Sequence, residues 1–362
     1  MKIKIIKQSA IMRRGGMFGY GAWPSVARTG DNKLTAVWSG GRIKHLCPFG
    51  KVMASDSFDG GMTWTEPRTL IDTPLDDRDA GLAVSGKTQI VTTFNNRVAT
   101  QREWNREPGI DPVAKKAIDD YLDSVKAEDE DKYYGSLTAV SNDGGETFSA
   151  VHKIAVTAPH GPIALQKGGF LYVGRWFDPA VDAPPEGDGI YALYSSDGYS
   201  WSKPVKVCGA CDDKVRLYCE PHAAELVTGE IIVGLRAHER DKTDDKFTVY
   251  TCFSKDGGKT FSSPESVGFM GSPPHFCITK TGTAVLSYAR RDADKAVYAR
   301  FSSDGRSWSD AVRLSDISES GDLGYPATVE TDDGKLCTVY YQKLDGDDNA
   351  SILCTVWEYS EK

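Results

Sequence analysis

Short apolar runs separated by polar turns fill almost the whole chain, and this pattern predicts β-strands rather than helices. The runs follow a fixed order. A strand that begins near Pro or His is followed by a Gly turn, a second strand ending in a polar or basic residue, a third strand, and a turn rich in Asp and Gly. Six such units lie at 23–64, 78–148, 159–201, 220–261, 274–308 and 324–357. Their spacing of about 50 to 60 residues is typical of a repeat fold.

The turn near the end of each of the first five units has a recurring sequence. The first copy reads Ser57-Phe-Asp-Gly-Gly-Met-Thr-Trp64, and the others lie at 141–148, 195–201, 254–261 and 302–308. Asp accepts hydrogen bonds from backbone N–H groups ahead of it, and Gly supplies a positive φ angle, so the stretch predicts a tight turn. We interpret each copy as a hairpin connection with a structural rather than catalytic role.

Six units of four-strand size predict an all-β fold, a six-bladed β-propeller of antiparallel blades that forms a single domain over residues 1–362. The last unit lacks a fourth strand, and the alternating stretch Lys2–Ile6 is expected to supply it and close the ring. The second unit carries an extra segment at 111–126. Asp111 before Pro112 is a good helix start, and apolar residues follow at helical spacing, so we expect one inserted helix that decorates the propeller.

Composition and charge narrow the functional classes. The net charge of −8 argues against nucleic acid as a partner. The sequence shows no run of apolar residues long enough to cross a membrane and no signal-peptide pattern, so a cytoplasmic protein is expected. Cys208 and Cys211 have the spacing of half a zinc site without a matching second pair, and we predict neither a metal nor a cofactor. The oligomeric state is left open.

In a propeller, equivalent positions of the inner strands converge at one mouth of the central channel. Basic side chains recur at these positions, which predicts a small anionic ligand. They are His160, His222 and His275 at the starts of first strands, Arg78 at the start of the second unit, and Arg175, Arg236 and Arg290 at the ends of second strands. Each has a structural alternative: the recurring histidines suit backbone hydrogen bonds, and Arg175 suits a carboxylate partner.

The turns Ser57–Trp64 and their copies resemble the Asp-box, or BNR repeat, of the sialidase superfamily, whose six-bladed propeller has the same number of units. Glu220, Arg236, Arg290 and Tyr325 also follow the order and spacing of the sialidase site. The resemblance implies that Tyr325 is a nucleophile activated by Glu220. It also implies that Arg236 and Arg290 bind a sugar carboxylate through paired hydrogen bonds.

The first half of the chain departs from the family pattern. Ala22-Trp23-Pro24 stands where sialidases have Arg-Ile-Pro, so one arginine is missing, with Arg13, Arg14 or Arg78 as possible replacements. The loop 39–51, where the family carries its acid/base Asp, has no carboxylate. Asp76, Asp77 and Asp79 in the next unit, or His45 within the loop, could take that role, and we expect Asp77 or Asp79 to be the acid/base.

These features favour an exo-acting glycoside hydrolase that cleaves a terminal acidic sugar similar to sialic acid, with a role in carbohydrate metabolism. A second hypothesis is a glycosidase for another sugar, such as a uronic acid, in which the Asp76–Asp79 carboxylates and Glu220 form an ordinary acid/base pair. A third hypothesis is a propeller that binds glycans without cleaving them, because the fold alone does not define an activity.

Overall fold

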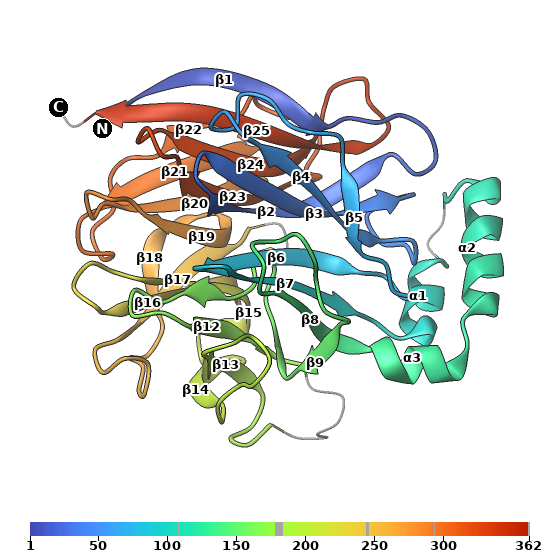
Figure 1. Cartoon of the computed structure of the whole chain (residues 1–362), viewed down its shortest axis with the longest axis horizontal. Coiled ribbons are helices and arrows are strands. Elements are labelled where there is room, and N and C mark those ends of the chain that lie inside the picture. The colour runs from blue at the N-terminus through green and yellow to red at the C-terminus, as the bar shows by residue number, and fades with distance from the viewer. Residues whose placement is uncertain (107–108, 178–183, 244–245, 293, 361–362) are drawn as a thin grey trace.

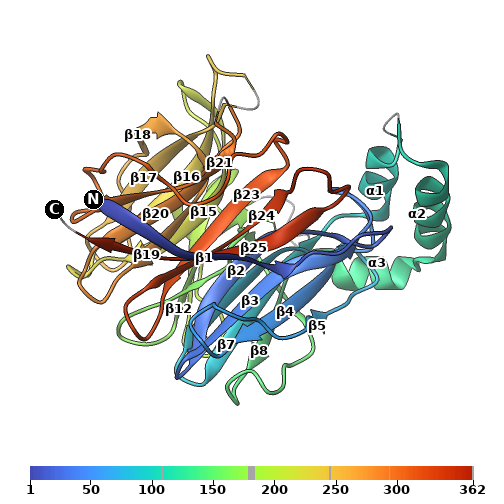
Figure 2. The ribbon, with the colours of Figure 1, turned by 90° about the horizontal axis from the view of Figure 1, so that it is seen from above.

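The computed structural model describes residues 1–106, 109–177, 184–243, 246–292 and 294–360. Its strands form six antiparallel sheets, and the innermost strands of neighbouring sheets contact one another around a common axis (Figures 1 and 2). Each sheet is one blade of a propeller, which confirms the predicted fold class. Apolar side chains from adjacent blades pack between the sheets and form the core.

The first three blades follow the chain in order. Blade 1 contains β2 (Tyr20–Gly30), β3 (Lys33–Arg42), β4 (Lys51–Ser57) and β5 (Arg68–Ile71). Blade 2 contains β6 (Arg78–Ser85), β7 (Thr88–Asn95), β8 (Gly135–Ser141) and β9 (His152–Ile154). Blade 3 contains β10 (Val156–Thr157), β11 (Ile163–Ala164), β12 (Phe170–Trp176), β13 (Gly189–Ser195) and β14 (Val205–Gly209), and both β10 and β11 pair with β12.

The last three blades complete the ring. Blade 4 contains β15 (Val215–Glu225), β16 (Ile231–Glu239), β17 (Thr248–Ser254) and β18 (Glu265–Met270). Blade 5 contains β19 (Ser272–Ile278), β20 (Ala284–Arg290), β21 (Ala296–Ser302) and β22 (Val312–Arg313). Blade 6 contains β23 (Leu323–Glu330), β24 (Leu336–Lys343), β25 (Ala350–Ser360) and β1 (Lys2–Met12).

Strand β1 pairs antiparallel with β25, so blade 6 combines the first and last strands of the propeller. The pairing runs from Lys2 opposite Ser360 to Met12 opposite Ile352. The two strands lie side by side in both views, with the N and C labels close together (Figures 1 and 2). This pairing covers the edge that β25 would otherwise expose to solvent.

Three helices are inserted between β7 and β8 and lie together at one side of the molecule (Figure 2). They are α1 (Val98–Trp104), α2 (Pro112–Ser124) and α3 (Ala127–Tyr133). Helix α2 is the predicted one, and the Asp111 carboxylate caps it by accepting from the backbone N–H groups of Val113 and Ala114. The other two helices are one short stretch each and begin without a side-chain cap, which explains why the sequence did not reveal them. No helix within the described residues is long and apolar enough to span a bilayer.

Four inner strands bend at the same depth, next to the central opening. Trp23, Asp79, Glu220 and Tyr325 all have positive φ angles, between 45° and 53°, and each lies where the register with the following strand shifts. Non-glycine residues rarely adopt this conformation, and such strain gathers at functional sites. The bends therefore mark the axial mouth as the place to look for a site.

The Asp-box turns connect the third and fourth strands of five blades. In the first copy, the Ser57 hydroxyl donates to the Asp59 carboxylate (2.9 Å) and accepts from the Gly61 N–H (2.8 Å). The same carboxylate accepts from the backbone N–H of Thr63 (2.8 Å). The serine-to-aspartate hydrogen bond recurs in the other four copies. The turns thus tie themselves together through their own side chains.

We expect Ser57→Ala to destabilise the protein by about 1–3 kcal/mol, because the Gly61 N–H would lose its buried acceptor. Urea unfolding followed by tryptophan fluorescence measures the change. Ser196→Ala, which alters an exposed serine in the third Asp-box, is the matched control and should leave stability within about 0.5 kcal/mol of the original. Equal stabilities for the two variants would contradict this role of the turn.

Candidate active site

A cavity of about 390 Å³ opens next to the bent strand ends. Its walls are aromatic, basic and acidic side chains contributed by several blades, a composition suited to a small polar ligand. The lining residues are His45, Arg236, Phe247, Arg291, Gly321, Asp322, Tyr325 and Tyr341.

Tyr325 and Glu220 face each other at the base of this cavity. The Tyr325 hydroxyl donates to one oxygen of Glu220 (2.7 Å), and the Arg236 guanidinium donates to the other (2.7 Å). Arg236 also lies 3.4 Å from the Tyr325 oxygen, and its guanidinium stacks on the Phe247 ring at 3.8 Å. The three residues that the sequence places in blades 4 and 6 are therefore in direct contact.

The charges in this cluster assign different proton states to the two acids. Burial alone would raise the pKa of Glu220, but Arg236 and the Tyr325 hydroxyl outweigh burial and lower it. Burial and the Glu220 charge raise the pKa of Tyr325 well above its usual value. At neutral pH, Tyr325 is thus a phenol that donates to a carboxylate, which is the arrangement of a nucleophile beside its base.

The arginine pair Arg290-Arg291 divides its roles in a way that the sequence prediction missed. Arg290, the residue predicted to bind the substrate, makes two hydrogen bonds to Asp292 (2.9 and 2.7 Å) and does not line the cavity. Its neighbour Arg291 does line it, with the guanidinium 5.7 Å from the Tyr325 ring centre and Nε bonded to the Leu323 carbonyl.

A glycine makes room for Arg291. Gly324 has a φ of +134°, and a Cβ added there would lie 2.9 Å from the Arg291 guanidinium. Any larger residue there would therefore crowd the Arg291 guanidinium and the Cβ of Ala289.

Arg78 lies on the blade 2 side of the mouth and is held by aromatic rings. Its guanidinium carbon is 4.4 Å from the Trp23 ring, 5.5 Å from Phe94 and 5.4 Å from Trp104. Within the described residues, no hydrogen bond or ion pair to its guanidinium is found, and its buried Nε has no partner. Arginine stacked on aromatic faces keeps its N–H donors available for an anion. Trp104, from helix α1, ties the insertion to this corner.

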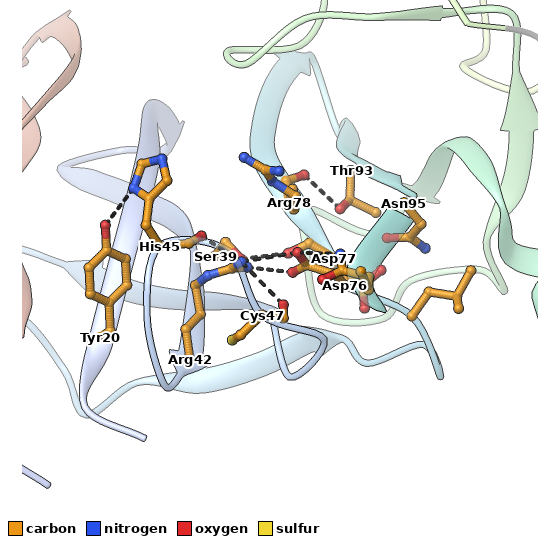
Figure 3. A network of polar contacts seen from close by, with 12 residues as sticks. Tyr20, Ser39, Arg42, His45, Cys47, Asp76, Asp77, Arg78, Thr93 and Asn95 are labelled. Atoms are coloured by element: carbon orange, nitrogen blue, oxygen red, sulfur yellow. Dashed lines mark hydrogen bonds and ion pairs between the residues drawn. The ribbon is translucent and has the colours of Figure 1, made fainter. Parts of the chain in front are cut away.

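The three aspartates of Leu75–Asp79 occupy different environments. Asp76 forms a fully buried ion pair with Arg42 (2.5 Å), as Figure 3 shows. Asp77 is also fully buried and accepts from the backbone N–H and the hydroxyl of Thr73 (2.7 and 3.0 Å). Both carboxylates therefore serve the packing of blades 1 and 2, and neither lines the cavity.

Of these three aspartates, Asp79 is the one whose charge acts on Tyr325. Burial, together with the charge of Glu220, raises its pKa to about 7 although Arg78 opposes the shift. Its Oδ1 is buried with no partner among the described residues. Only 9% of the residue is exposed, and it does not line the cavity.

The loop after β3 carries His45 into the cavity wall. The buried Arg42 donates to the backbone carbonyls of His45 (2.9 Å) and Cys47 (3.3 Å) and so fixes the loop (Figure 3). His45 Nδ1 lies 2.7 Å from the Tyr20 hydroxyl and 3.3 Å from the Asp322 carboxylate. In Figure 3, the His45 ring and the Arg78 guanidinium project to the same side of this network.

The predicted histidines of the mouth lie deeper, packed against one another on the axis. The rings of His222 and His275 stack at 4.1 Å, and the His160 ring lies 4.9 Å from that of His275. His222 Nδ1 accepts from the Phe276 N–H, and His275 Nδ1 accepts from the Thr328 N–H in the next blade. This is the structural alternative that the sequence left open, since the three residues are buried and do not line the cavity.

The remaining predicted arginines lie away from the cavity in exposed ion pairs. Arg14 is 3.7 Å from Glu66, and Arg175 is 3.1 Å from Asp188. Arg13, a further candidate for the missing arginine, pairs with Asp347. None of the three lines the cavity. Arg78 does not line it either, but it stacks on Trp23, which packs against His45 in the cavity wall.

Reasoning from sequence also missed several residues of the wall, namely Phe247, Asp322 and Tyr341 in addition to Arg291. The signal for Arg291 and Tyr341 was present, because both lie at or just beyond the ends of second strands, where the blades converge. Phe247 and Asp322 each precede a strand, at positions that do not recur from blade to blade, so no repeat pattern could reveal them.

The fold and its turns define a six-bladed propeller with Asp-box repeats. Residues 121–338 match the family model described as the BNR repeat-like domain, and the chain belongs to this family. A comparison with curated protein sequences finds no match.

Solved structures share the fold over nearly the whole chain. A protein of unknown function from Dyadobacter fermentans matches over 99% of both chains, with a TM-score of 0.76 and 20% identity. The Hadza microbial sialidase Hz136 matches 96% of this chain and 68% of its own, with a TM-score of 0.66 and 15% identity. An intramolecular trans-sialidase from Ruminococcus gnavus, solved with oseltamivir carboxylate, matches 95% of this chain and 96% of its own, with a TM-score of 0.64 and 13% identity. The propeller thus matches those of sialidases in fold.

The buried histidines predict acid sensitivity. Burial lowers the pKa of His160 to about 4 and that of His275 well below its usual value. At these histidines the unfolded chain therefore binds more protons than the folded one below about pH 6.5, so their contribution to stability falls as the pH decreases toward 4. We expect His275→Asn, which keeps an acceptor for the Thr328 N–H, to flatten this loss.

Urea unfolding at pH 7.5 and pH 5 measures the effect as the difference between the two pH values for each protein. A constant offset between the original protein and His275→Asn at both pH values would contradict the prediction, because it would reflect packing alone.

Proposed function

We propose that this propeller is a retaining glycoside hydrolase that removes a terminal sugar bearing a carboxylate, with Tyr325 as nucleophile and Glu220 as its base. The observation that carries the proposal is the 2.7 Å hydrogen bond from the Tyr325 hydroxyl to Glu220 at the base of an arginine-rich cavity. A tyrosine with a raised pKa needs a base to become a nucleophile, and Glu220, with its lowered pKa, is ready to take the proton.

The charge around the cavity supports an acidic substrate. Arg236 and Arg291 line it, and Arg78 stacks on Trp23, which packs against His45 in the cavity wall, with donors that no carboxylate within the described residues occupies. Guanidinium groups bind carboxylates through paired hydrogen bonds. A carboxylate nucleophile would be repelled by such a substrate, whereas a neutral tyrosine is not, and this is the reason why tyrosine suits an acidic sugar.

The sugar class follows from one further observation. In the first blade, the site of an expected arginine carries Trp23, and Arg78 stacks on its ring from the second blade. The carboxylate would therefore lie between Arg291, Arg236 and Arg78. Sialic acid is the first candidate because relatives of the same fold are sialidases. A hexuronic acid is the second candidate. Its carboxylate is further from the anomeric carbon than that of sialic acid, and an arginine that comes from the second blade instead of the first would suit a carboxylate at a different position.

The test is turnover of 4-methylumbelliferyl glycosides of sialic acid and of glucuronic acid by the purified protein and its Tyr325→Phe variant. We expect release of the fluorophore from one of them and a loss of about 10³-fold or more in kcat for the variant, because the nucleophile is removed. Tyr199→Phe, at an exposed Asp-box turn, is the control and should retain full activity.

Two results would contradict the proposal. Equal turnover by the original protein and Tyr325→Phe would remove the tyrosine from the chemistry. Saturable binding of acidic glycans without release of sugar from a broad panel would instead identify a binding propeller.

A further inference from the structure

We propose that His45 is the general acid and base of this reaction, with Asp322 and Tyr20 as the residues that position it. The assignment rests on the proposed function, because it supplies the proton that a tyrosine nucleophile mechanism requires. It concerns a residue from the loop after β3, whereas the nucleophile and its base come from blades 6 and 4.

His45 lies in the right part of the site. Its half-buried ring lines the same cavity as Tyr325, and both rings pack against Trp23, with centroids 4.9 and 6.4 Å from the Trp23 ring. Trp23 and Tyr341 each contact both rings, so the imidazole and the phenol belong to one aromatic cluster in the cavity wall. A leaving-group oxygen above Tyr325 would lie between them.

The hydrogen bonds at Nδ1 define the orientation of the imidazole. The Tyr20 hydroxyl donates to the Asp322 carboxylate (2.9 and 3.0 Å), so its oxygen accepts from His45 Nδ1–H (2.7 Å). Asp322 Oδ1, 3.3 Å from Nδ1, adds a negative charge on the same side. This pattern assigns the second nitrogen, Nε2, as the atom that takes up or releases a proton.

A buried ion pair outside the cavity fixes the loop that carries His45. Arg42, fully buried and paired with Asp76, donates to the His45 carbonyl and so anchors the backbone directly beneath the ring. Gln101 of helix α1 also donates to Asp76 (3.0 Å). The inserted helices thus support the position of His45 through two buried side chains.

The aspartates are less suited to this role. Asp77 is fully buried and accepts two hydrogen bonds from Thr73, so its carboxylate is committed to the turn. The charge of Asp79 acts on Tyr325, and that of Glu220 acts on Asp79, but Asp79 is only 9% exposed and is not among the residues that line the cavity. A proton donor must reach the leaving-group oxygen directly or through one water. His45 is the candidate whose ring is open to the cavity.

The surrounding charges tune His45 in opposite directions. Burial lowers its pKa, Asp322 opposes this by favouring the imidazolium, and Arg78 and Arg42 lower it further. Across the cavity lie Arg236 and Arg291, both lining residues. An anionic sugar bound by the arginines would offset their charge and favour the protonated ring at the moment when a donor is needed.

The proton balance closes over two steps. In the first, the Tyr325 oxygen attacks the anomeric carbon and passes its proton to Glu220, while the bond to the leaving group breaks and its oxygen takes the proton from His45 Nε2. In the second, a water attacks the same carbon and gives a proton to Nε2. The bond from carbon to Tyr325 then breaks, and Glu220 returns the proton to the phenol.

The test compares two glycosides of the same acidic sugar, one with a 4-nitrophenyl leaving group and one with a methyl leaving group. The phenolate leaves without a proton donor, whereas methoxide does not. We expect His45→Ala to lose about 10²–10⁴-fold in kcat/KM on the methyl glycoside and less than about tenfold on the aryl glycoside. His45→Gln serves as the second variant if the alanine variant folds poorly.

Asp79→Asn and Tyr325→Phe are assayed in parallel. They distinguish a wrong assignment of the acid/base from a wrong assignment of the nucleophile. Asp79→Asn should lower activity on both glycosides by a similar factor. If Asp79→Asn shows the leaving-group dependence and His45→Ala does not, the assignment to His45 is wrong. If Tyr325→Phe stays active, the proposed nucleophile is wrong even where His45 shows its expected signature. An original protein that hydrolyses neither glycoside contradicts both.

The pH profile tests the positioning residues. Activity on the methyl glycoside should fall as the pH rises through the His45 pKa, because the donor is then lost. Asp322→Asn removes the charge that favours the imidazolium, so this descending limb should move to lower pH. A residue with a purely structural role would change the rate but leave the limb in place, and that result would overturn the role of Asp322.

Discussion

The site depends on a backbone constraint, the left-handed conformation of four residues at equivalent depths in the inner strands. In a regular strand, side chains alternate between the two faces of the sheet and would point toward the neighbouring blades. At Trp23, Asp79, Glu220 and Tyr325 the left-handed backbone and the shift in register interrupt this alternation. The conformation costs about 1–3 kcal/mol at each residue and is tolerated because the surrounding sheets hold both ends of every bend.

The blades alone do not complete the cavity. The loop after β3 supplies His45 to the cavity wall, and outside the wall the helices inserted in blade 2 place Trp104 against Arg78. The buried pair of Arg42 and Asp76 connects these additions, since it contacts both the loop and helix α1. Removing one partner of such a pair leaves an uncompensated buried charge, so the pair is costly to separate. The loop and helix α1, which are both hydrogen-bonded to the pair, are therefore held in place together.

Repetition made the fold predictable from sequence. The Asp-box copies set the blade register, and the register placed Glu220, Arg236 and Tyr325 together, where the structure has them in contact. Site residues at positions that do not recur from blade to blade could not be predicted from the sequence. Adjacent residues in a strand point to opposite sides, and a strand end that bends breaks this rule, so nothing in the pair Arg290-Arg291 could say which one enters the cavity. The contact between His45 and Asp322 joins positions 277 residues apart with no pattern to relate them.

The pairing of β1 with β25 has a consequence for how the site comes into being. Blade 6, which carries Tyr325, remains a three-stranded sheet until residues from opposite ends of the propeller meet. While the chain is being synthesised, β1 has no partner and presents an open edge that invites pairing with other chains. The blade with the tyrosine is thus the last to be completed, and the protein cannot hold a finished cavity before every blade is in place.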